Sequence, residues 1–574
     1  MSDRIVHFSR DSFGPDQPFT VIGKGELGGK AQGLAFIQRT LADRLGPGQT
    51  AGIRVAIPTL TVVTTSLFDT FVGHNQLGAM EASGLPDDRI ARAFLRAELP
   101  VELVGDLWAL IDRARGPLAV RSSSLLEDIA GRPLAGVYAT KMIPNSEPDP
   151  DARFRQLVEA IKLVWASTYF EEARTYRSTV GSDDEHMGVI VQEVVGLGHG
   201  QRFYPNVSGV ARSINYYPSG YARPEDGVVE LALGLGKWIV DGEPVWGYSP
   251  AFPKAPPPFN DLNEMLRFTQ NAFWAINLGT APYDPAKETE YMLRCELAAA
   301  EADDTVRYVG STFDPQSGRL APGVSRKGPR LINFAPLLQY GVAPVNDALR
   351  AVLAACEDAT GGPVEIEFAL TLDQLGEAPA HLGFLQVRPL VAPGEVCEVG
   401  EEELGADRVL VASDHALGNG QLDDIRDVVY VRPDRFDPAR SPAVAAEIGA
   451  LNETLRRGSR PYLLVGFGRW GTSDPWAGVP VKWAQISGAR AIVEAQLPEV
   501  RPELSQGSHF FHNLTSFGVL YLSVGHRGPY RVKWSWLDGQ AAEGESMHLR
   551  HVRLAHPLTI RVDGRTGRGV ITHD

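Results

Sequence analysis

The sequence predicts an α/β (α+β) protein built from several compact units, and three observations support this fold class. Apolar strand-like runs alternate with amphipathic helical runs over the first ~200 residues, which is typical of layered α/β folds. The chain of 574 residues is too long for one hydrophobic core and suits about three or four structural units. Its apolar content of 44% and charged content of 22% are ordinary for a globular protein.

The expected elements begin with a glycine-rich turn that leads into a helix, in GGKAQGLAFIQRTLADRL at residues 28–45. Apolar residues recur there every three or four positions, as one face of a helix requires. The later expected elements are helices at 154–177, 262–302 and 344–359, and strands at 188–195, 208–217, 364–370 and 382–390.

The domain organisation follows from these elements and from one change in composition. Residues 1–200 and 201–391 are expected to form two subdomains of a first large unit. Residues 392–407 are acidic, poor in large apolar residues and contain Pro and Gly, so they are interpreted as a linker. Residues 408–574 are expected to form a smaller unit of α/β or mainly β type.

Charge and cysteine content limit the classes of partner and compartment. The net charge of −15 argues against a nucleic-acid or acidic-membrane surface, because the field of the protein would repel phosphate. The three cysteines, Cys295, Cys356 and Cys397, lie far apart and suit a reducing compartment better than a disulfide framework. No apolar leader and no apolar run of about 18 residues is found. We therefore expect a soluble cytoplasmic protein that binds neither nucleic acid nor membrane.

Two cations in the first 130 residues are suited to binding phosphate. Lys30 follows the glycine turn at the start of a helix, where a positive charge needs an anionic partner. Arg121 is expected at the end of a short apolar strand and is followed by three serines; its planar fork matches phosphate oxygens. The alternatives are a solvated lysine, and an arginine that pairs with Glu127 or Asp128.

Two later strands place polar residues in pairs. Glu365 and Glu367 share one face of VEIEFAL, and Gln386 and Arg388 share one face of FLQVRPL. Such a patch is costly inside an apolar sheet unless a ligand such as Mg²⁺ with a triphosphate balances it. The alternative is the solvated outer face of an amphipathic sheet.

These segments resemble, in the same order, the N-terminal ATP-grasp domain of the phosphoenolpyruvate synthase and pyruvate phosphate dikinase family. GGKAQGL, LAVRSSSLLED, GVIVQEVV, VEIEFAL and LQVRPL carry the resemblance, which spans roughly residues 20–392. The TIM barrel that accompanies this domain in the family needs about 250 residues, and the ~165 that follow the linker show no barrel pattern.

The resemblance implies that ATP and Mg²⁺ are the cofactors and assigns roles to eight residues. The first acid of the metal pair is usually aspartate in the family, whereas this chain has a glutamate there. The implied roles are phosphate contacts for Lys30, Arg121, Gln386 and Arg388, metal ligation for Glu365 and Glu367, and the adenine slot for Gln192 and Glu193.

The second unit holds a segment that resembles the phosphohistidine motif of the family's swivelling domain. In SHFFHNLTSFGV, Ser508 and His509 precede Gly518 and Val519 at the family's spacing, and a neutral imidazole is a good nucleophile toward phosphorus. The alternatives are a packed core histidine and a metal pair with His512. A Gly-rich loop in YLLVGFGRWGTSDPW, residues 462–476, is either an anion site or a tight turn over packed tryptophans.

Three functions are consistent with these features. The first is an ATP-dependent phosphotransferase of dikinase type that acts on an unidentified small-molecule or protein acceptor, with His509, Arg121 and Arg388 as the catalytic residues. The second is an ATP-grasp ligase that activates a carboxylate as an acyl phosphate. The third is a non-catalytic nucleotide-binding regulatory protein.

Overall fold

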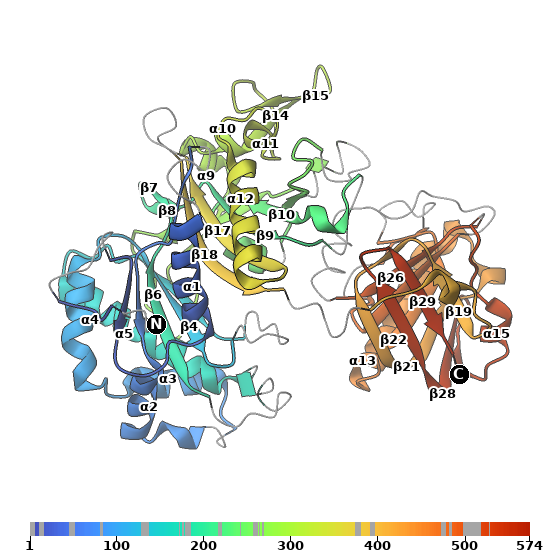
Figure 1. The fold of residues 1–574 in the computed structure, drawn as a ribbon, viewed down its shortest axis with the longest axis horizontal. Coiled ribbons are helices and arrows are strands. Elements are labelled where there is room, and N and C mark those ends of the chain that lie inside the picture. Colours follow the sequence, from blue (N-terminus) through green and yellow to red (C-terminus); the bar gives the residue numbers. More distant parts are fainter. Residues whose placement is uncertain are drawn as a thin grey trace. The chain divides into compact units, whose positions relative to one another are not determined.

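The computed structural model describes residues 6–573 apart from several gaps, and the chain forms two compact units (Figure 1). The gaps are residues 11–16, 45–51, 81–83, 128–136, 172, 175–176, 178–184, 216–217, 219–220, 242, 256–261, 263–264, 267–268, 373–379, 391–396, 472–477, 482–484, 497–517 and 527. Unit 1 contains residues 1–213, 229–254 and 269–390, and unit 2 contains residues 214–228, 255–268 and 391–574. Among the described residues, no helix is long and apolar enough to cross a membrane.

The N-terminal part of unit 1 is a five-stranded sheet covered by helices. Its strands, in spatial order, are β1 (Phe19–Ile22), β3 (Leu60–Val63), β6 (Met187–Glu193), β4 (Leu118–Ser124) and β5 (Thr140–Ile143). The helices that share its core are α2 (Thr65–His74), α3 (Asp87–Arg96), α4 (Val101–Arg113) and α5 (Pro150–Ala166). Trp165 is fully buried in this core, and its ring centroid lies 4.8 Å from that of Phe71. Burial of such aromatic area is the main source of stability in this layer.

A six-stranded sheet forms the second layer of unit 1 and contains the two predicted strands with paired polar residues. Its strands, in spatial order, are β11 (Trp246–Tyr248), β10 (Val228–Ala232), β9 (Val207–Arg212), β17 (Val364–Thr371), β18 (His381–Pro389) and β2 (Arg54–Ala56). Helices α1 (Gly29–Arg44) and α12 (Val345–Thr360) pack against it, as Figure 1 shows. The predicted helices at 28–45 and 344–359 and the predicted strands at 364–370 and 382–390 are therefore confirmed.

The remaining elements of unit 1 correct the predicted helix at 262–302. The structure places β12 (Ala272–Asn277) and β13 (Met292–Glu296) there, followed by the short helix α9 (Leu297–Ala302). Phe273 and Ala275 are buried and alternate with the partly exposed Trp274, so the pattern has the two-residue period of a strand. Both strands join β8 (Arg202–Tyr204) and β7 (Leu197–His199), and a separate three-stranded sheet contains β14 (Gly310–Asp314), β15 (Arg319–Pro322) and β16 (Arg330–Ile332).

The described part of unit 1 also contains short helices. They are α7 (Lys237–Val240), α10 (Val306–Val309) and α11 (Ala335–Leu338). The predicted helix at 154–177 is interrupted: α5 ends at Ala166, a 3₁₀ turn, η2 (Ser167–Tyr169), follows, and the described residues 171, 173, 174 and 177 are helical again.

Unit 2 is a nine-stranded mixed sheet whose edge strands are consecutive in the chain. Its strands, in spatial order, are β19 (Val409–Ser413), β29 (Arg568–Thr572), β28 (Leu549–Asp563), β21 (Gly420–Val431), β22 (Tyr462–Phe467), β25 (Ala489–Ala495), β26 (Leu520–Val524) and β20 (Ala416–Leu417), with β27 (Ala542–Glu545) paired to β28. Only two residues separate β19 from β20, so the two edges of the sheet curl toward each other. Ser413 Oγ donates to Ser523 O at 2.5 Å across this closure.

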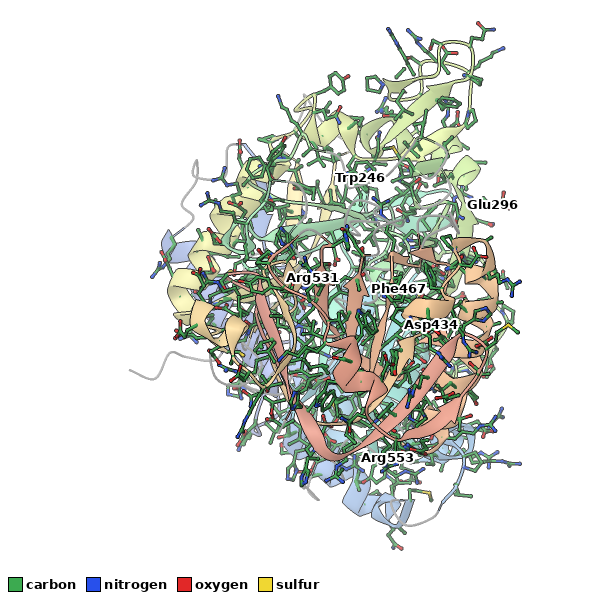
Figure 2. The ribbon with its side chains drawn as sticks, turned by 90° about the vertical axis from the view of Figure 1, so that its right-hand side faces the viewer. Trp246, Glu296, Asp434, Phe467, Arg531 and Arg553 are labelled. Carbon is green, nitrogen blue, oxygen red and sulfur yellow. The ribbon has the colours of Figure 1, made fainter. Side chains whose placement is uncertain are left out.

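Aromatic and aliphatic side chains fill the inside of the unit 2 sheet. Figure 2 labels Phe467, at the end of β22, whose ring centroid lies 5.3 Å from that of Phe436 and 5.2 Å from that of Trp534. Helix α13 (Ser441–Arg457) connects β21 to the parallel strand β22, and the short helix α15 (Trp534–Asp538) supplies Trp534. Strands β23 (Arg469–Trp470) and β24 (Gly478–Val479) form a separate two-stranded ribbon.

Residues 397–405, in the expected linker, pack against unit 2. Cys397, Val399 and Leu404 are buried against Val409 and Val570, and Leu404 belongs to a 3₁₀ turn, η4 (Glu401–Gly405), that precedes β19. This half of the acidic segment therefore belongs to the folded unit, because its few apolar residues are spaced to reach one core.

The glycine turn before α1 lies directly on β4. Gly28 has φ of +79°, and a Cβ at this position would lie 1.7 Å from the Ser123 carbonyl oxygen. The Ser123 hydroxyl accepts from the Ala31 amide at 3.0 Å and donates to Leu27 O at 2.8 Å. The turn therefore needs a residue without a side chain at this position.

We predict that Gly28→Ala destabilises unit 1. Backbone strain alone costs about 1–3 kcal/mol, and the clash with Ser123 adds to it. Thermal unfolding followed by circular dichroism measures the effect. The control is Gly73→Ala in α2, where a Cβ meets nothing within 4 Å. This control should be neutral or stabilising by up to about 1 kcal/mol. Equal unfolding temperatures for the two variants would contradict the close approach of the turn to β4.

Candidate functional site

Lys30, the second residue of α1, reaches β4 across the glycine turn. Its Nζ donates to Ser122 Oγ at 3.0 Å and to Glu127 Oε1 at 2.9 Å. Only 2% of the Glu127 side chain is exposed, and this carboxylate also accepts from Ser122 Oγ and from the Ser124 amide. Because a buried carboxylate is stable only when its oxygens are satisfied, this network holds the ammonium group in one place.

Arg121 lies in the middle of β4 and extends toward the second sheet of unit 1. Its Nη1 donates to Leu385 O at 2.9 Å and to Gln192 Oε1 at 3.3 Å. Its Nη2 donates to Gln386 Oε1 at 2.8 Å and lies 3.5 Å from Glu367 Oε2. The planar guanidinium is thus oriented by β6, β17 and β18 together.

Glu365 and Glu367 lie on the same face of β17, directly opposite Arg388 and Gln386 of β18. Arg388 Nη2 donates to Glu367 Oε1 at 2.8 Å, and Arg388 Nε forms an ion pair of 3.0 Å with Glu365 Oε1. Arg212 of β9 donates from Nε to Glu365 Oε2 at 2.6 Å. The four predicted strand residues therefore meet in one cluster, which we call the β17 charge cluster together with Lys30, Arg121 and Arg212.

Burial and charge act in opposite directions on Glu367. Burial alone would raise the pKa of this carboxyl group, but the nearby charges of Arg121, Arg388 and Lys30 outweigh it and hold the pKa below its usual value. Glu367 is therefore ionised at neutral pH. The exposed fractions of Glu365 and Glu367 are 12% and 25%, so the solvated outer face considered as an alternative is wrong.

Gln192 is buried beside Arg121 and has one unsatisfied group. Its Oε1 accepts from Arg121, but its Nε2 has no hydrogen-bond partner among the described residues. A buried amide donor without a partner is rare in folded proteins and indicates a place for a ligand acceptor. Glu193 follows on β6, so its side chain points to the opposite face of the sheet and does not join the cluster.

The groups in the β17 charge cluster fit an anion that carries a hard cation. Lys30, Arg121 and Arg388 supply cationic donors, as phosphate oxygens require. Glu367 and Gln386 are cross-strand neighbours and offer a carboxylate and an amide oxygen, which suits Mg²⁺ bound jointly by protein and phosphate. Glu365 fits this role less well, because its Oε2 is held by Arg212, which also pairs with Glu230.

A cavity of about 430 Å³ lies next to the cluster and is distinct from it. Gly29, Gln32, Gly33, Phe36, Leu125, Glu127, Thr360, Val387 and Pro389 line it. Val387 and Pro389 alternate with Gln386 and Arg388 along β18, so the cavity adjoins the opposite face of that strand. Glu127 is the side chain that the cavity shares with the Lys30 network.

The structure changes two details of the predicted site. Arg121 pairs with Glu367 rather than with Glu127, which pairs with Lys30 instead, and Asp128 lies outside the described residues. Arg121 also lies within β4 rather than at its end, because β6 pairs with β4 as far as Ser124.

Sequence reasoning missed Arg212 and Glu230. Their pattern offered a clue, since each places a charge in the otherwise apolar strands VSGVAR and VVELA. Assigning these charges to the site required knowledge of which strands are neighbours.

Several predicted residues of unit 2 fall outside the described part of the chain. They are His509, His512, Thr472, Ser473, Asp474 and Trp476. Trp470 is described and is buried, with 2% exposed and its Nε1 donating to Val493 O at 3.3 Å. This tryptophan therefore packs in the core, as the tight-turn alternative expects.

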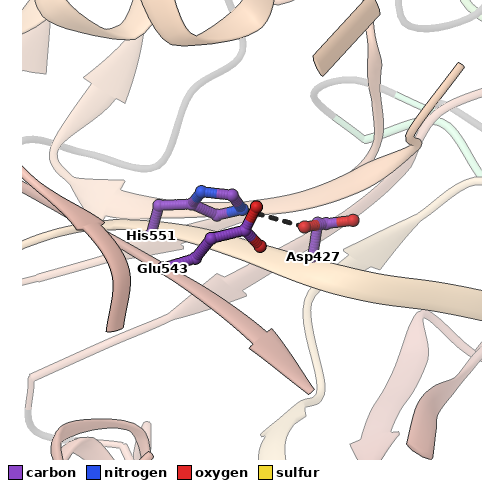
Figure 3. A group of neighbouring side chains, drawn as sticks. All are labelled: Asp427, Glu543 and His551. Atoms are coloured by element: carbon purple, nitrogen blue, oxygen red, sulfur yellow. Dashed lines mark hydrogen bonds and ion pairs between the residues drawn. The ribbon is translucent and has the colours of Figure 1, made fainter. Parts of the chain in front are cut away.

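A second group of titratable side chains lies in unit 2 (Figure 3). Asp427, Glu543 and His551 offer ligand atoms within 4.8 Å of one another, and His551 Nε2 lies 2.8 Å from Asp427 Oδ1. Arg460 Nε donates to Asp427 Oδ2 at 3.1 Å, and Nη1 donates to Glu543 Oε1 at 2.9 Å. Because this guanidinium already donates to both carboxylates, the group is interpreted as a structural ion network and not as a metal site.

Comparison with known proteins agrees with the resemblance predicted from the sequence. Residues 24–247 match the family model of the pyruvate phosphate dikinase AMP/ATP-binding domain. This stretch includes Lys30, Arg121, Gln192 and Glu193, whereas the residues of β17 and β18 lie beyond it.

Curated relatives match the same part of the chain. A phosphoenolpyruvate synthase of Aeropyrum pernix is 26% identical over 240 residues, which are 38% of this chain and 26% of the relative. A rifampicin phosphotransferase of Streptomyces sviceus is 29% identical over 238 residues, 38% of this chain and 23% of the relative. An uncharacterized phosphotransferase of Bacillus subtilis is 27% identical over 188 residues, 32% of this chain and 20% of the relative. The chain thus spans about a quarter or less of the length of these relatives.

We predict that Arg460→Met destabilises unit 2 by about 3 kcal/mol, because it leaves the buried Asp427 without its main cation. Burial raises the pKa of Asp427, but hydrogen bonds from His551 and Arg460 outweigh it and lower the pKa. Hydrogen bonds from Arg460 lower the pKa of Glu543 as well. A depressed folded-state pKa means stability that is present above the unfolded value, about 4, and lost as pH falls further.

Urea unfolding at pH 7 and pH 3 measures this effect, and the difference between wild type and Arg460→Met should shrink at pH 3. Arg457→Met is the control, because Arg457 is exposed and its ion pair is with Glu453 one helical turn away. It should cost less than about 0.5 kcal/mol. A pH-independent difference for Arg460→Met would show that its guanidinium does not act through these carboxylates.

Proposed function

We propose that this protein is an ATP-dependent phosphotransferase of dikinase type. The observation that carries the proposal is the convergence of three cations, Lys30, Arg121 and Arg388, around the ionised Glu367. The AMP/ATP-binding family match over residues 24–247 and the phosphotransferase names of its relatives support it. An ATP-grasp architecture for unit 1 belongs to the same proposal.

Two arginines of the cluster bind a carboxylate first and phosphate when the nucleotide enters. Arg121 and Arg388 contact Glu367 in the structure, and on nucleotide binding their N–H groups reorient toward the β- and γ-phosphoryl oxygens. Lys30 adds a third donor, and Glu127 and Ser122 keep it in position. Such preorganised donors stabilise the charge that develops on the transferred group.

Once the arginines have turned to the phosphates, the carboxylate of Glu367 is available to bind a metal ion. Glu367, with the Gln386 amide oxygen beside it, would hold Mg²⁺, which neutralises charge on the phosphoryl oxygens. Gln192 Nε2 supplies the remaining buried donor to the nucleotide, whereas the Glu193 side chain points to the opposite face of β6 and takes no part in this contact.

The phosphoryl acceptor is an unidentified small molecule or protein. In the dikinase scheme, a histidine of the second unit carries the phosphoryl group between the nucleotide and this acceptor. His509 is the residue proposed for this step, on the motif of residues 508–519 alone. The imidazole nitrogen attacks the β-phosphorus, and the bond from that phosphorus to the oxygen shared with the α-phosphate breaks, so that AMP leaves. Water then removes the γ-phosphoryl group as phosphate, and the phosphoramidate passes the β-phosphoryl group onward.

We predict that Arg388→Ala weakens binding of Mg·ATP by about 1.5–3 kcal/mol, because a charge-assisted contact to phosphate is lost. Isothermal titration calorimetry measures the affinity. Arg44→Ala is the matched control, because Arg44 lies on α1 and forms an exposed pair with Asp358. Undiminished affinity in Arg388→Ala would remove this residue from the phosphate site.

We also predict that incubation with ATP labelled at the β-phosphate leaves an acid-labile label on the protein. His509→Asn should lose this label, whereas His512→Asn should keep it. AMP and phosphate are the expected products of dikinase chemistry, while ADP and phosphate would indicate a ligase and no turnover a regulatory protein. Label retained in His509→Asn would exclude the carrier role.

A further inference from the structure

A row of alternating charges crosses four strands of the second sheet in unit 1. It runs from Glu230 on β10 to Arg212 on β9, Glu365 on β17 and Arg388 on β18. Arg212 Nη1 donates to Glu230 Oε2 at 3.1 Å, and its Nε donates to Glu365 Oε2 at 2.6 Å. Arg388 Nε continues the row at 3.0 Å from Glu365 Oε1.

Glu365 and Glu367, the two acids of β17, differ in the arginines that contact them. The partners of Glu367, Arg121 and Arg388, both lie beside Gln386 and can transfer their donors to an incoming phosphate. Arg212 lies on the far side of Glu365 and is fixed between two carboxylates. A cation at Glu365 would have to displace Arg212 or lie next to it, and both are electrostatically costly.

The environment of Arg212 supports a permanent contact. Burial alone would lower the pKa of this guanidinium, but Glu230 and Glu365 outweigh it and raise the pKa. Arg212 and Glu365 expose only 24% and 12% of their side chains, so water screens their contact weakly.

Charge balance points the same way. The β17 charge cluster, with its partners Glu127 and Glu230, contains four carboxylates and four cations: Glu127, Glu230, Glu365 and Glu367 against Lys30, Arg121, Arg212 and Arg388. Removal of Arg212 would leave Glu365 to be balanced by Arg388 and would hold that arginine away from the phosphate.

We infer that Glu365 is a positioning residue for Arg388, that Arg212 and Glu230 anchor it, and that Glu367 is the one acidic metal ligand on β17. This inference rests on the proposed function and changes its metal site. Glu365 stands where the resembled family usually has aspartate, and its longer side chain reaches Arg212 on the neighbouring strand β9. Arg212 thus acts on nucleotide binding through Glu365 and Arg388.

The test measures binding of the non-hydrolysable analogue adenylyl imidodiphosphate by calorimetry, with saturating Mg²⁺ and with EDTA. The ratio of the two affinities reports metal coupling independently of catalysis. Glu367→Gln should lower this ratio about tenfold or more. Glu365→Gln should weaken both affinities about tenfold and leave the ratio within about twofold of wild type, because it disturbs Arg388 and not the metal.

Arg212→Met should behave as Glu365→Gln does, and the double variant should bind no more weakly than the weaker single variant. Arg223→Met, an exposed arginine, is the control. If Arg212→Met fails to fold, the affinity ratios of Glu365→Gln and Glu367→Gln still show which of the two acids binds the metal.

Two outcomes overturn the inference, and they are distinguishable. A ratio for Glu365→Gln as low as that for Glu367→Gln shows that Glu365 binds the metal, and the proposed function survives. Absence of analogue binding by the wild-type chain, with and without Mg²⁺, rejects the proposed function and the inference together.

Discussion

The ionised carboxylate of Glu367 is the group on which the candidate site depends. It lies largely inside unit 1, where an isolated charge is unstable, and it persists because Arg121 and Arg388 come to it from different sheets. Arg121 arrives from β4 of the five-stranded sheet, and Arg388 arrives from β18 of the six-stranded sheet. The interaction therefore joins the two layers and sets the distance between the cations that are to receive phosphate.

Where strand periodicity and local chemistry agreed, the sequence was sufficient to predict the structure. The alternation in residues 364–370 placed Glu365 and Glu367 on one face, and β17 and β18 pair with these two acids directly opposite Arg388 and Gln386. The glycine turn before α1 was predictable for the same reason, since few sequences permit the approach that Gly28 makes to β4.

Predictions failed where the deciding contact joins strands that are distant in sequence. Arg212 and Glu365 are separated by 153 residues, and nothing local to either one indicates that β9 lies beside β17. Arg121 was similarly assigned a nearby acid as an alternative, whereas its partner Glu367 comes from a different sheet. The predicted helix over 262–302 failed for another reason: the segment contains the short strands β12 and β13, and burial in β12 alternates with a period of two.

The charged groups of unit 1 and unit 2 differ in how completely their hydrogen bonds are satisfied. In unit 2, Arg460 donates to both Asp427 and Glu543, and His551 lies within hydrogen-bond distance of Asp427. In unit 1, the β17 charge cluster together with Glu127 and Glu230 contains as many cations as carboxylates. Its hydrogen bonds are incomplete, because the buried Nε2 of Gln192 has no partner among the described residues. A network whose buried hydrogen-bonding groups are all satisfied contributes stability, whereas one that leaves a buried donor without a partner is prepared for a ligand. The arginines at Glu367 can exchange one anion for another with little change in their positions, and this small reorganisation is what electrostatic stabilisation of phosphoryl transfer requires.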